Sequence, residues 1–285
     1  MESELWQTVY PMVVAAGKGR EAKRVQHADT TVVLTYLWAV LHDRPVSWAC
    51  RASSWPRRLR VHPRPSAATM SRRLRTASVH RLLKRVARRL RGRFGTSWCK
   101  WIDGRPLPVG RATQDRQARL GYAVNGLAKG YKLYVICDAR GGVDAWEVWP
   151  MNVAEKRVAR RLIRRLQGEG YLVGDTQYDS SRLYDLVAQR GFQLVTRRRR
   201  GRGLGHCRHS PARLRAIALL QRPFGQALMD QRYDIDRFFA HMSNFGAGLA
   251  PLPNWVRTLH RVRLWVAAKL ILNAARLTLR RPNAA

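Results

Sequence analysis

The chain has 285 residues, with 54 Lys and Arg against 18 Asp and Glu, and a formal net charge of +36 at pH 7. Because 46% of the residues are hydrophobic and the Trp count is 10, it can bury a sizeable core, which excludes a disordered basic tail. The charge requires a polyanionic partner. Nucleic acid is the first candidate, since the arginines are spread over every segment, whereas membrane-binding basic segments are usually local.

Cysteines and apolar runs exclude further classes. The cysteines are Cys50, Cys99, Cys137 and Cys207. They are far apart and form no CxxC pair, so neither a disulfide framework nor a four-ligand zinc site is expected. The acidic residues Glu2 and Glu4 are not expected at the start of a signal peptide, which is basic. The apolar run over 265–275 is interrupted by Lys269 and is too short to span a bilayer. We expect no membrane partner and a reducing compartment, the cytoplasm.

Residues 1–95 predict an all-α domain that we assign to DNA binding. Asp29 can cap a helix of apolar residues, and a Pro-rich basic connection follows at 55–65. The next short helix begins at an N-cap Ser and mixes small polar residues with arginines, which suits insertion into the major groove. Its candidate DNA-binding residues are Ser66, Thr69, Arg72 and Arg73. A solvated basic helix is the alternative, because the connection is longer than a helix-turn-helix allows.

After a basic amphipathic helix over 79–90, Gly92 and Gly95 mark a domain boundary and the pattern changes to strands. The predicted strands cover 98–102, 131–137, 143–149, 171–173 and 192–196, the first ending at Asp103. Asn152 and Glu155 predict a capping box for a helix before the fourth strand, and Ser180 caps another after it.

This element order predicts an α/β fold: a ribonuclease-H-like mixed five-stranded sheet with flanking helices, preceded by the all-α N-terminal domain. Three strands joined by short turns are extended by parallel strands through crossover helices. Right-handed crossovers place the first and fourth strands side by side, which brings Asp103 and Asp175 together. Two adjacent carboxylates repel each other unless a cation lies between them, so the pair predicts a metal site.

The predicted catalytic domain, 96–285, contains a basic Arg/Gly-rich insertion at about 197–221 and ends in a basic amphipathic helix. The insertion is too polar to pack in a core and suits contact with a phosphate backbone; a disordered basic linker is the alternative. Its arginines at the start are Arg197, Arg198, Arg199 and Arg200. Within it, His206, Cys207 and His209 are interpreted as part of a basic loop, because no second half of a metal site is present.

From about Asp29 to about Arg276, the chain resembles the DDE transposases of bacterial insertion sequences. The segments that carry the resemblance are IDGRPLPVG, KGYKLY, NVAEKRVARRLI, GDTQYDS and RYDIDRFFAHMSNFGAGLAPLPNWVR. The resemblance places the first two catalytic acids at Asp103 and Asp175. It places the third at Asp236, where relatives usually have Glu in an R-x-x-x-E-R context.

This resemblance implies that Asp103, Asp175 and Asp236 hold two Mg²⁺ ions, with Mn²⁺ as a substitute, and cleave and join DNA strands without a covalent enzyme intermediate. Lys132, Tyr178 and Arg232 are further candidate DNA contacts. A core position is the alternative for Tyr178, and an i,i+4 ion pair with Asp236 is the alternative for Arg232.

The implied partners are double-stranded DNA, at the terminal inverted repeats and the target, and a second copy of the chain in a homodimer on DNA. The implied place is the bacterial cytoplasm, associated with the nucleoid. Two alternatives stay open: a catalytically inactive or domesticated DNA-binding protein, and a ribonuclease-H-like nuclease without strand transfer. The carboxylate at Asp236, although about one methylene shorter than Glu, favours activity.

Overall fold

The computed structural model describes residues 2–19, 25–61, 63–123, 126–198, 210–243, 249 and 251–280. The chain divides into two compact units. Unit 1 consists of Met1–Phe94, Met242–Val256 and His260–Ala285; unit 2 consists of Gly95–His241 and Arg257–Leu259. The C-terminal helix, which the sequence analysis placed in the second region, therefore groups with the N-terminal helices.

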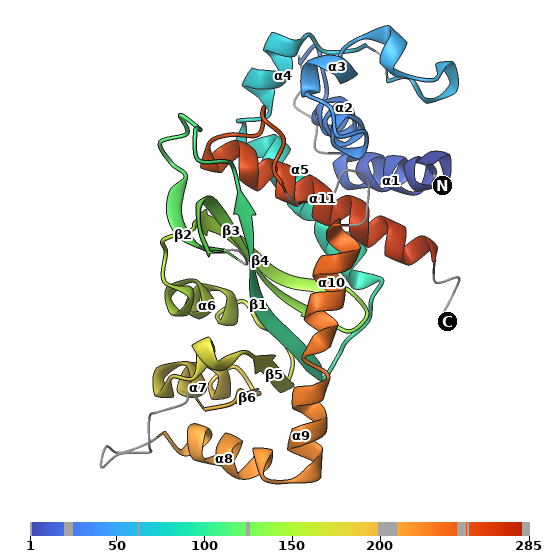
Figure 1. The fold of residues 1–285 in the computed structure, drawn as a ribbon. Helices are drawn as coiled ribbons and strands as arrows, with labels where there is room; N and C mark the ends of the chain where they lie inside the picture. Colours follow the sequence, from blue (N-terminus) through green and yellow to red (C-terminus); the bar gives the residue numbers. More distant parts are fainter. Residues whose placement is uncertain are drawn as a thin grey trace. The chain divides into compact units, whose positions relative to one another are not determined.

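Unit 1 is helical, as the sequence predicts for its first 95 residues (Figure 1). Its elements are α1 (Glu2–Gly17), α2 (Asp29–Leu41), α3 (Val46–Ala49), α4 (Ala67–Arg73), α5 (Ala77–Gly92), α11 (Leu259–Leu279) and the short turns η1 (Ala52–Ser54) and η2 (Arg57–Leu59). Helix α2 is buried on all sides from Thr31 to Val40, which explains its continuous apolar sequence. Trp38 stacks on Trp55 at 4.6 Å between ring centroids and meets Trp6 edge-on at 4.9 Å. These rings form the aromatic centre of the unit.

An ion pair is buried in unit 1. Lys269 of α11 is 1% exposed, and its Nζ lies 2.5 Å from Asp43 Oδ1. Burial lowers the pKa of Lys269, and the neighbouring Asp43 carboxylate opposes that effect. Asp43 has a φ of 51°, a left-handed backbone conformation that Asn also adopts readily. The charge of Asp43 can therefore be removed without introducing backbone strain.

We expect Asp43→Asn to lower the free energy of unfolding by about 3 kcal/mol, because it leaves the Lys269 ammonium buried without its opposite charge. Urea unfolding followed by far-UV circular dichroism measures the change. The matched control is Asp43→Asn combined with Lys269→Met, which removes both charges and should recover most of the loss. If the double variant is no more stable than Asp43→Asn, the unpaired charge is not the cause.

Unit 2 contains a six-stranded mixed sheet. Its strands are β1 (Cys99–Pro108), β2 (Arg119–Ala123), β3 (Gly126–Asp138), β4 (Val143–Pro150), β5 (Gly170–Gly174) and β6 (Phe192–Val195). The order is β2-β3-β1-β5-β6, with β4 also paired to β3; β1, β3 and β4 are antiparallel neighbours, whereas β1, β5 and β6 are parallel. This arrangement confirms the predicted ribonuclease-H-like sheet.

Two details of the sheet differ from the prediction. Strand β2, which the sequence analysis expected to be a loop, pairs with the start of β3. Its Leu120 and Tyr122 side chains are exposed, so the sequence lacks the alternation of apolar and polar residues that predicts a half-buried strand. Strand β1 continues past Asp103 to Pro108. Gly104 and Pro106 do not end it. The pairing with β5 stops at Gly174, so beyond Ile102 that side of β1 is a sheet edge, where a Pro without a backbone N–H breaks no hydrogen bond to a neighbouring strand.

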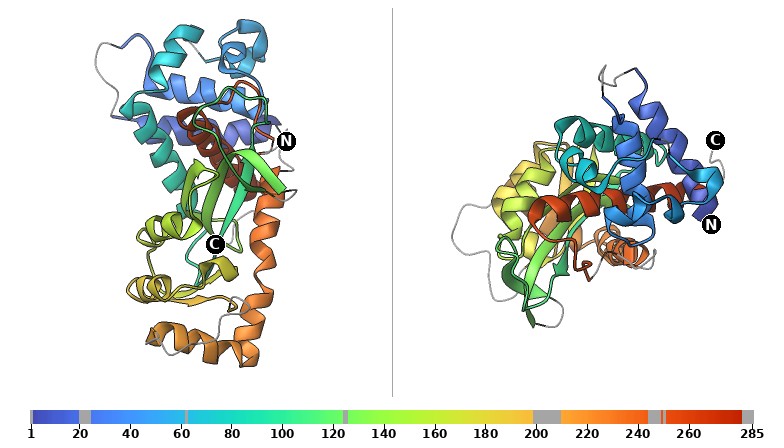
Figure 2. Two further views of the ribbon diagram at one scale, coloured as in Figure 1. Left: turned by 60° about the vertical axis from the view of Figure 1, so that its left-hand side comes forward. Right: turned by 90° about the horizontal axis from the view of Figure 1, so that it is seen from above.

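The helices of unit 2 are α6 (Glu155–Ile163), α7 (Ser181–Ala188), α8 (Pro211–Leu220), α9 (Pro223–Asp230), α10 (Tyr233–Ser243) and the turn η3 (Thr176–Tyr178). Helices α6 and α7 lie on one side of the sheet and α10 on the other, as Figures 1 and 2 show from different directions. A hydrophobic core cluster lies under α6 and α7 and includes Ile102, Tyr134, Val158 and Leu162. No helix in the described part of the chain is long and apolar enough to cross a membrane.

The N-terminus of α6 differs from the predicted capping box. Its N-cap residue is Ala154, no side chain caps it, and Glu155 is the first helical residue rather than the third. The Glu155 carboxylate is therefore not used to complete the helix end. It contacts a lysine of the sheet instead.

Candidate active site

Asp103 and Asp175 lie on adjacent parallel strands. The register pairs Ile102 of β1 with Gly174 of β5, so the next residue of each strand is an aspartate. The Gly104 N–H donates to Asp103 Oδ1 at 2.7 Å, and the Gln177 N–H donates to Asp175 Oδ1 at 2.9 Å. The predicted neighbourhood of strands β1 and β5 is confirmed.

Both carboxyls are held where the charged form is disfavoured. Burial raises the pKa of Asp103 to about 6; the Gly104 N–H opposes this effect, and the Asp175 charge adds to it. Burial also raises the pKa of Asp175, and the Glu155 charge adds to this effect. Without a cation, burial is therefore the main reason that the charged forms of these two acids are disfavoured.

The burial of Asp103 predicts a pH dependence of the metal-free protein. Because the pKa of Asp103 rises from 3.8 to about 6 on folding, its contribution favours the folded state at low pH and is lost as the pH rises through that window. We expect Asp103→Asn to be more stable than the wild type above pH 6, by roughly 2 kcal/mol, and the difference to shrink towards pH 4. Chemical unfolding in EDTA measures it. A difference that does not change with pH would contradict the buried state of Asp103.

Three more charged side chains act on this pair. Lys132 of β3 forms an ion pair with Glu155 of α6, and the side chains are 15% and 24% exposed. Arg232, directly before α10, lowers the pKa of both Asp103 and Asp175. The sequence analysis identified Lys132 and Arg232 but interpreted Glu155 only as a capping residue. A carboxylate in the first turn of the helix that follows β4 was the available signal.

Tyr178, a candidate DNA contact for which a core position was the alternative, is 1% exposed and belongs to the core under α6 and α7. It follows Asp175 in the turn η3, and its ring lies against Gly174, where an added Cβ would come within 2.9 Å of it. Burial, then the charges of Asp103 and Glu155, raises the pKa of Tyr178 well above its usual range. Its hydroxyl is therefore shielded from solvent.

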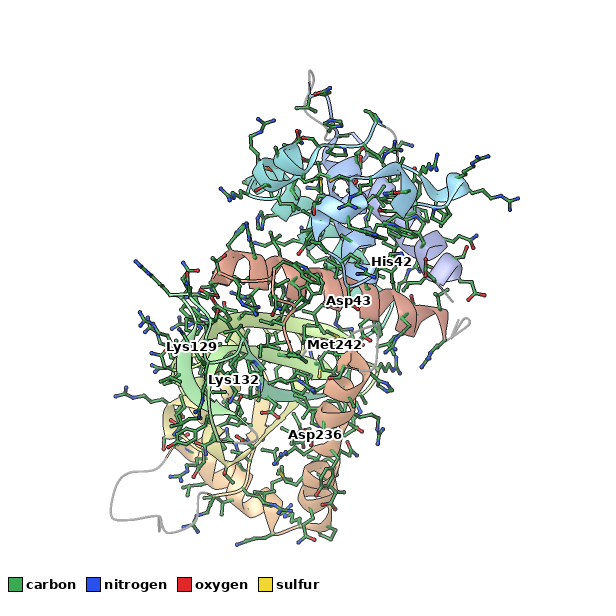
Figure 3. The ribbon with its side chains drawn as sticks, turned by 45° about the horizontal axis from the view of Figure 1, so that its top comes forward. His42, Asp43, Lys129, Lys132, Asp236 and Met242 are labelled. Carbon is green, nitrogen blue, oxygen red and sulfur yellow. The ribbon has the colours of Figure 1, made fainter. Side chains whose placement is uncertain are left out.

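Asp236 lies on α10, on the other face of the sheet from α6; Figure 3 labels it together with Lys132 of β3. Its charge acts on Arg105: burial lowers the pKa of Arg105, and Asp236 raises it. The Arg105 guanidinium also lies 5.7 Å from the ring centroid of Phe239, three residues further along α10. Asp103 and Arg105 share one face of β1, so α10 covers the face to which Asp103 belongs.

Of the candidate DNA-binding residues of unit 1, some form hydrogen bonds within the fold, whereas Arg72 is exposed to solvent. Ser66 caps α4 by accepting from the Thr69 N–H at 3.1 Å. Arg73 donates to Asp29 Oδ1 at 2.7 Å and to the His27 carbonyl at 2.8 Å, so it holds the fold together. Arg72 is exposed.

Of the predicted arginine run in unit 2, Arg197 and Arg198 are exposed. Arg199 and Arg200 lie outside the described residues, as do His206, Cys207 and His209.

The sheet order and the paired strand-end acids define an α/β protein with a ribonuclease-H-like core. A family model described as the Transposase DDE domain matches residues 95–271, more than half of the chain. The chain therefore belongs to this family, which implies phosphoryl transfer on DNA.

Among solved structures, the chain is similar to piggyBac transposase in a synaptic complex with hairpin DNA. The likeness has 10% sequence identity and a TM-score of 0.47, and it covers 96% of this chain and 71% of that chain. A search of curated proteins found no match.

Divalent metal use follows from the family, and the residues present suit it. Asp103 and Asp175 offer carboxylate oxygens, and the Tyr178 hydroxyl beside them has no hydrogen-bond partner among the described residues. In the same part of the chain, no three His, Cys, Asp or Glu residues lie close enough to hold a metal by themselves. Mg²⁺ is commonly held by one or two carboxylates, with water and substrate phosphate completing its shell. The site fits that mode of binding.

Proposed function

We propose that this protein is an insertion-sequence transposase that cleaves DNA at the ends of its element and joins the released 3′ end to target DNA. The observation that carries this proposal is the pair of partly buried acids on adjacent strands of a ribonuclease-H-like sheet, within a DDE family match. Two Mg²⁺ ions, when bound, would activate the attacking oxygen and stabilise the leaving oxygen. Asp103 and Asp175 would hold them, and Arg232 would bind a phosphate beside them.

The experiment is Mg²⁺-dependent cleavage and joining of a labelled duplex that carries the inverted repeat flanking the reading frame. Cleavage followed by joining supports the transposase. Cleavage without joining would identify a nuclease without strand transfer, and binding without cleavage would identify an inactive DNA-binding protein. The place of action would be the bacterial nucleoid.

For the third acid we propose Asp236. We expect Asp236→Ala to lower the cleavage rate at least tenfold and Asp236→Glu to retain it, because Glu keeps at this position the carboxylate that the proposed metal site needs. The matched control is Asp234→Asn, which removes the other carboxylate in the first turn of this helix, ion-paired to Arg237 at 3.0 Å. Loss of cleavage with Asp234→Asn but not with Asp236→Ala would move the third acid to position 234.

For the partners we propose double-stranded DNA and a second copy of the chain on that DNA. The net charge of +36 and the exposed arginines, including Arg72, Arg197 and Arg198, support the DNA partner. Binding to the inverted-repeat duplex, with the stoichiometry measured by analytical ultracentrifugation, tests both parts.

A further inference from the structure

A cavity of about 220 Å³ lies in unit 1, between α2, α3, the C-terminal end of α4 and the start of α11. Every residue that lines it belongs to unit 1, so the strands that carry the two acids take no part in it. The function proposed above does not use this cavity. Its lining combines an aromatic wall with a set of arginines.

The wall of the cavity is aromatic and apolar. Tyr36 of α2 and Leu264 and Trp265 of α11 are buried. Trp255, from the segment before α11, also lines the cavity but is 40% exposed, so part of its indole ring is not covered by the protein. An indole face that is free to pack takes up flat aromatic ligands by stacking, and it does so with any nucleobase. This wall therefore suits a planar ligand.

Arginines give the cavity its charge. Arg44, Arg75 and Arg261 line it and are exposed, and no Asp or Glu belongs to the described residues of the lining. Burial lowers the pKa of His260, another lining residue, and the charges of His80, Arg75 and Arg261 add to this effect. The arginines are therefore close enough to act on the cavity, which suits an anionic ligand such as a phosphate.

Two buried nitrogens of the lining, Trp265 Nε1 and His260 Nε2, have no hydrogen-bond partner in the described part of the chain. Trp265 is 2% exposed, so the protein shields its N–H from solvent. An indole N–H can only donate, and a buried donor without an acceptor is costly. A ligand that carries hydrogen-bond acceptors on a flat ring would remove this cost.

Resting on the proposed function for the choice of ligand, we propose that this cavity binds one nucleotide, with its base against Trp255 and its phosphate on Arg75 and Arg261. A nucleotide joins a planar ring with hydrogen-bond acceptors to an anion, which are the two properties that the lining selects. A base that is stacked and paired in a duplex cannot enter a cavity, so a nucleotide of DNA must be unpaired to bind. A free mononucleotide has the same chemistry, and the experiment separates these two sources.

The test compares two labelled duplexes that are identical except for a single unpaired adenine, by fluorescence anisotropy with the full-length protein in EDTA. We expect the wild type to bind the bulged duplex on the order of tenfold more tightly, as for the stacking of one base on an aromatic side chain. Trp255→Ala should abolish this preference and Trp255→Phe should keep most of it. The matched control is Trp98→Ala, which removes a tryptophan of unit 2 that is 54% exposed and should leave the preference unchanged.

Two arginines provide a second matched comparison. Arg72 and Arg75 are both exposed, but only Arg75 lines the cavity. Arg75→Gln should therefore weaken binding of the bulged duplex severalfold more than binding of the paired one, whereas Arg72→Gln should weaken both equally. Equal effects of Arg75→Gln on the two duplexes would contradict the assigned phosphate contact.

Equilibrium dialysis with labelled deoxyadenosine monophosphate tests the free mononucleotide. Binding that Trp255→Ala loses, without a preference for the bulged duplex, would identify the free nucleotide as the ligand. If the wild type shows neither the preference nor this binding, or if Trp255→Ala leaves both unchanged while thermal melting shows it folded, the inference is wrong. Tight binding of the paired duplex in that case leaves the proposed function intact. Binding of neither duplex would instead contradict DNA as the partner.

Discussion

Replacing Asp175 by Asn will lower the rate of Mg²⁺-dependent strand cleavage on the order of 10³-fold, which corresponds to several kcal/mol of transition-state stabilisation. Asn keeps the size of the side chain and can accept from the Gln177 N–H, which Asp175 Oδ1 accepts at 2.9 Å, so the turn η3 should persist. What it removes is the negative charge next to Asp103. Single-turnover cleavage of an end-labelled duplex measures the rate.

The control for this substitution is Asp185→Asn, which changes a carboxylate of α7 that accepts a hydrogen bond from Ser210 outside the site. It should retain cleavage. Combining Asp103→Asn with Asp175→Asn should cost little more than either alone, because residues that act as one unit lose their function together. Full cleavage by Asp175→Asn would refute the assignment of the acid pair.

Raising the salt concentration from about 50 mM to about 200 mM will lower the affinity for duplex DNA on the order of 10³-fold or more, if the protein neutralises at least about six phosphates. The reason is that a chain with 54 Lys and Arg has many side chains that can neutralise phosphates, and each phosphate neutralised releases condensed counterions from the DNA. Fluorescence anisotropy of a labelled duplex across a salt series gives the slope. A flat response would contradict DNA as the partner.

Two neighbouring arginines of α4 provide a matched comparison for that slope. Arg72 is exposed, whereas Arg73 is bonded to Asp29 and to the His27 carbonyl. If Arg72 contacts a phosphate, Arg72→Gln should reduce the magnitude of the log–log salt slope by about 0.9 with little change in stability. Arg73→Gln should instead lower the melting temperature. If Arg72→Gln and Arg73→Gln change the salt slope equally, the predicted difference between the two arginines is wrong.

The acid pair was predictable because it depends on local patterns and one topological rule. Short apolar runs mark β1 and β5, and the right-handed crossover through α6 makes them neighbours, which the register from Cys99–Tyr171 to Ile102–Gly174 confirms. The position of Asp103 within β1 was less predictable. Gly104 and Pro106 normally end a strand, and only the early stop of β5 lets this one continue.

The surroundings of the acids depended on contacts between faces that no local pattern encodes. Glu155 fits a capping box in the sequence, yet in the structure it contacts Lys132, which β3 presents under the N-terminus of α6. Tyr178 follows a strand-end acid and is polar enough for a surface, yet Gly174 leaves room for its ring in the core. Such positions follow from which faces pack together, and that is a property of the whole sheet.

The sequence by itself determined the class of fold, the order of the five predicted strands, the basic character of the chain and the neighbourhood of Asp103 and Asp175. These features follow from periodicity, composition and chain connectivity, which can be determined from residues close together in the sequence. Only the tertiary structure decided that Glu155 pairs with Lys132, that Tyr178 lies in the core, and that α11 groups with the N-terminal helices. The physical reason is that long-range packing and buried electrostatics arise between residues far apart in sequence, once their elements have folded.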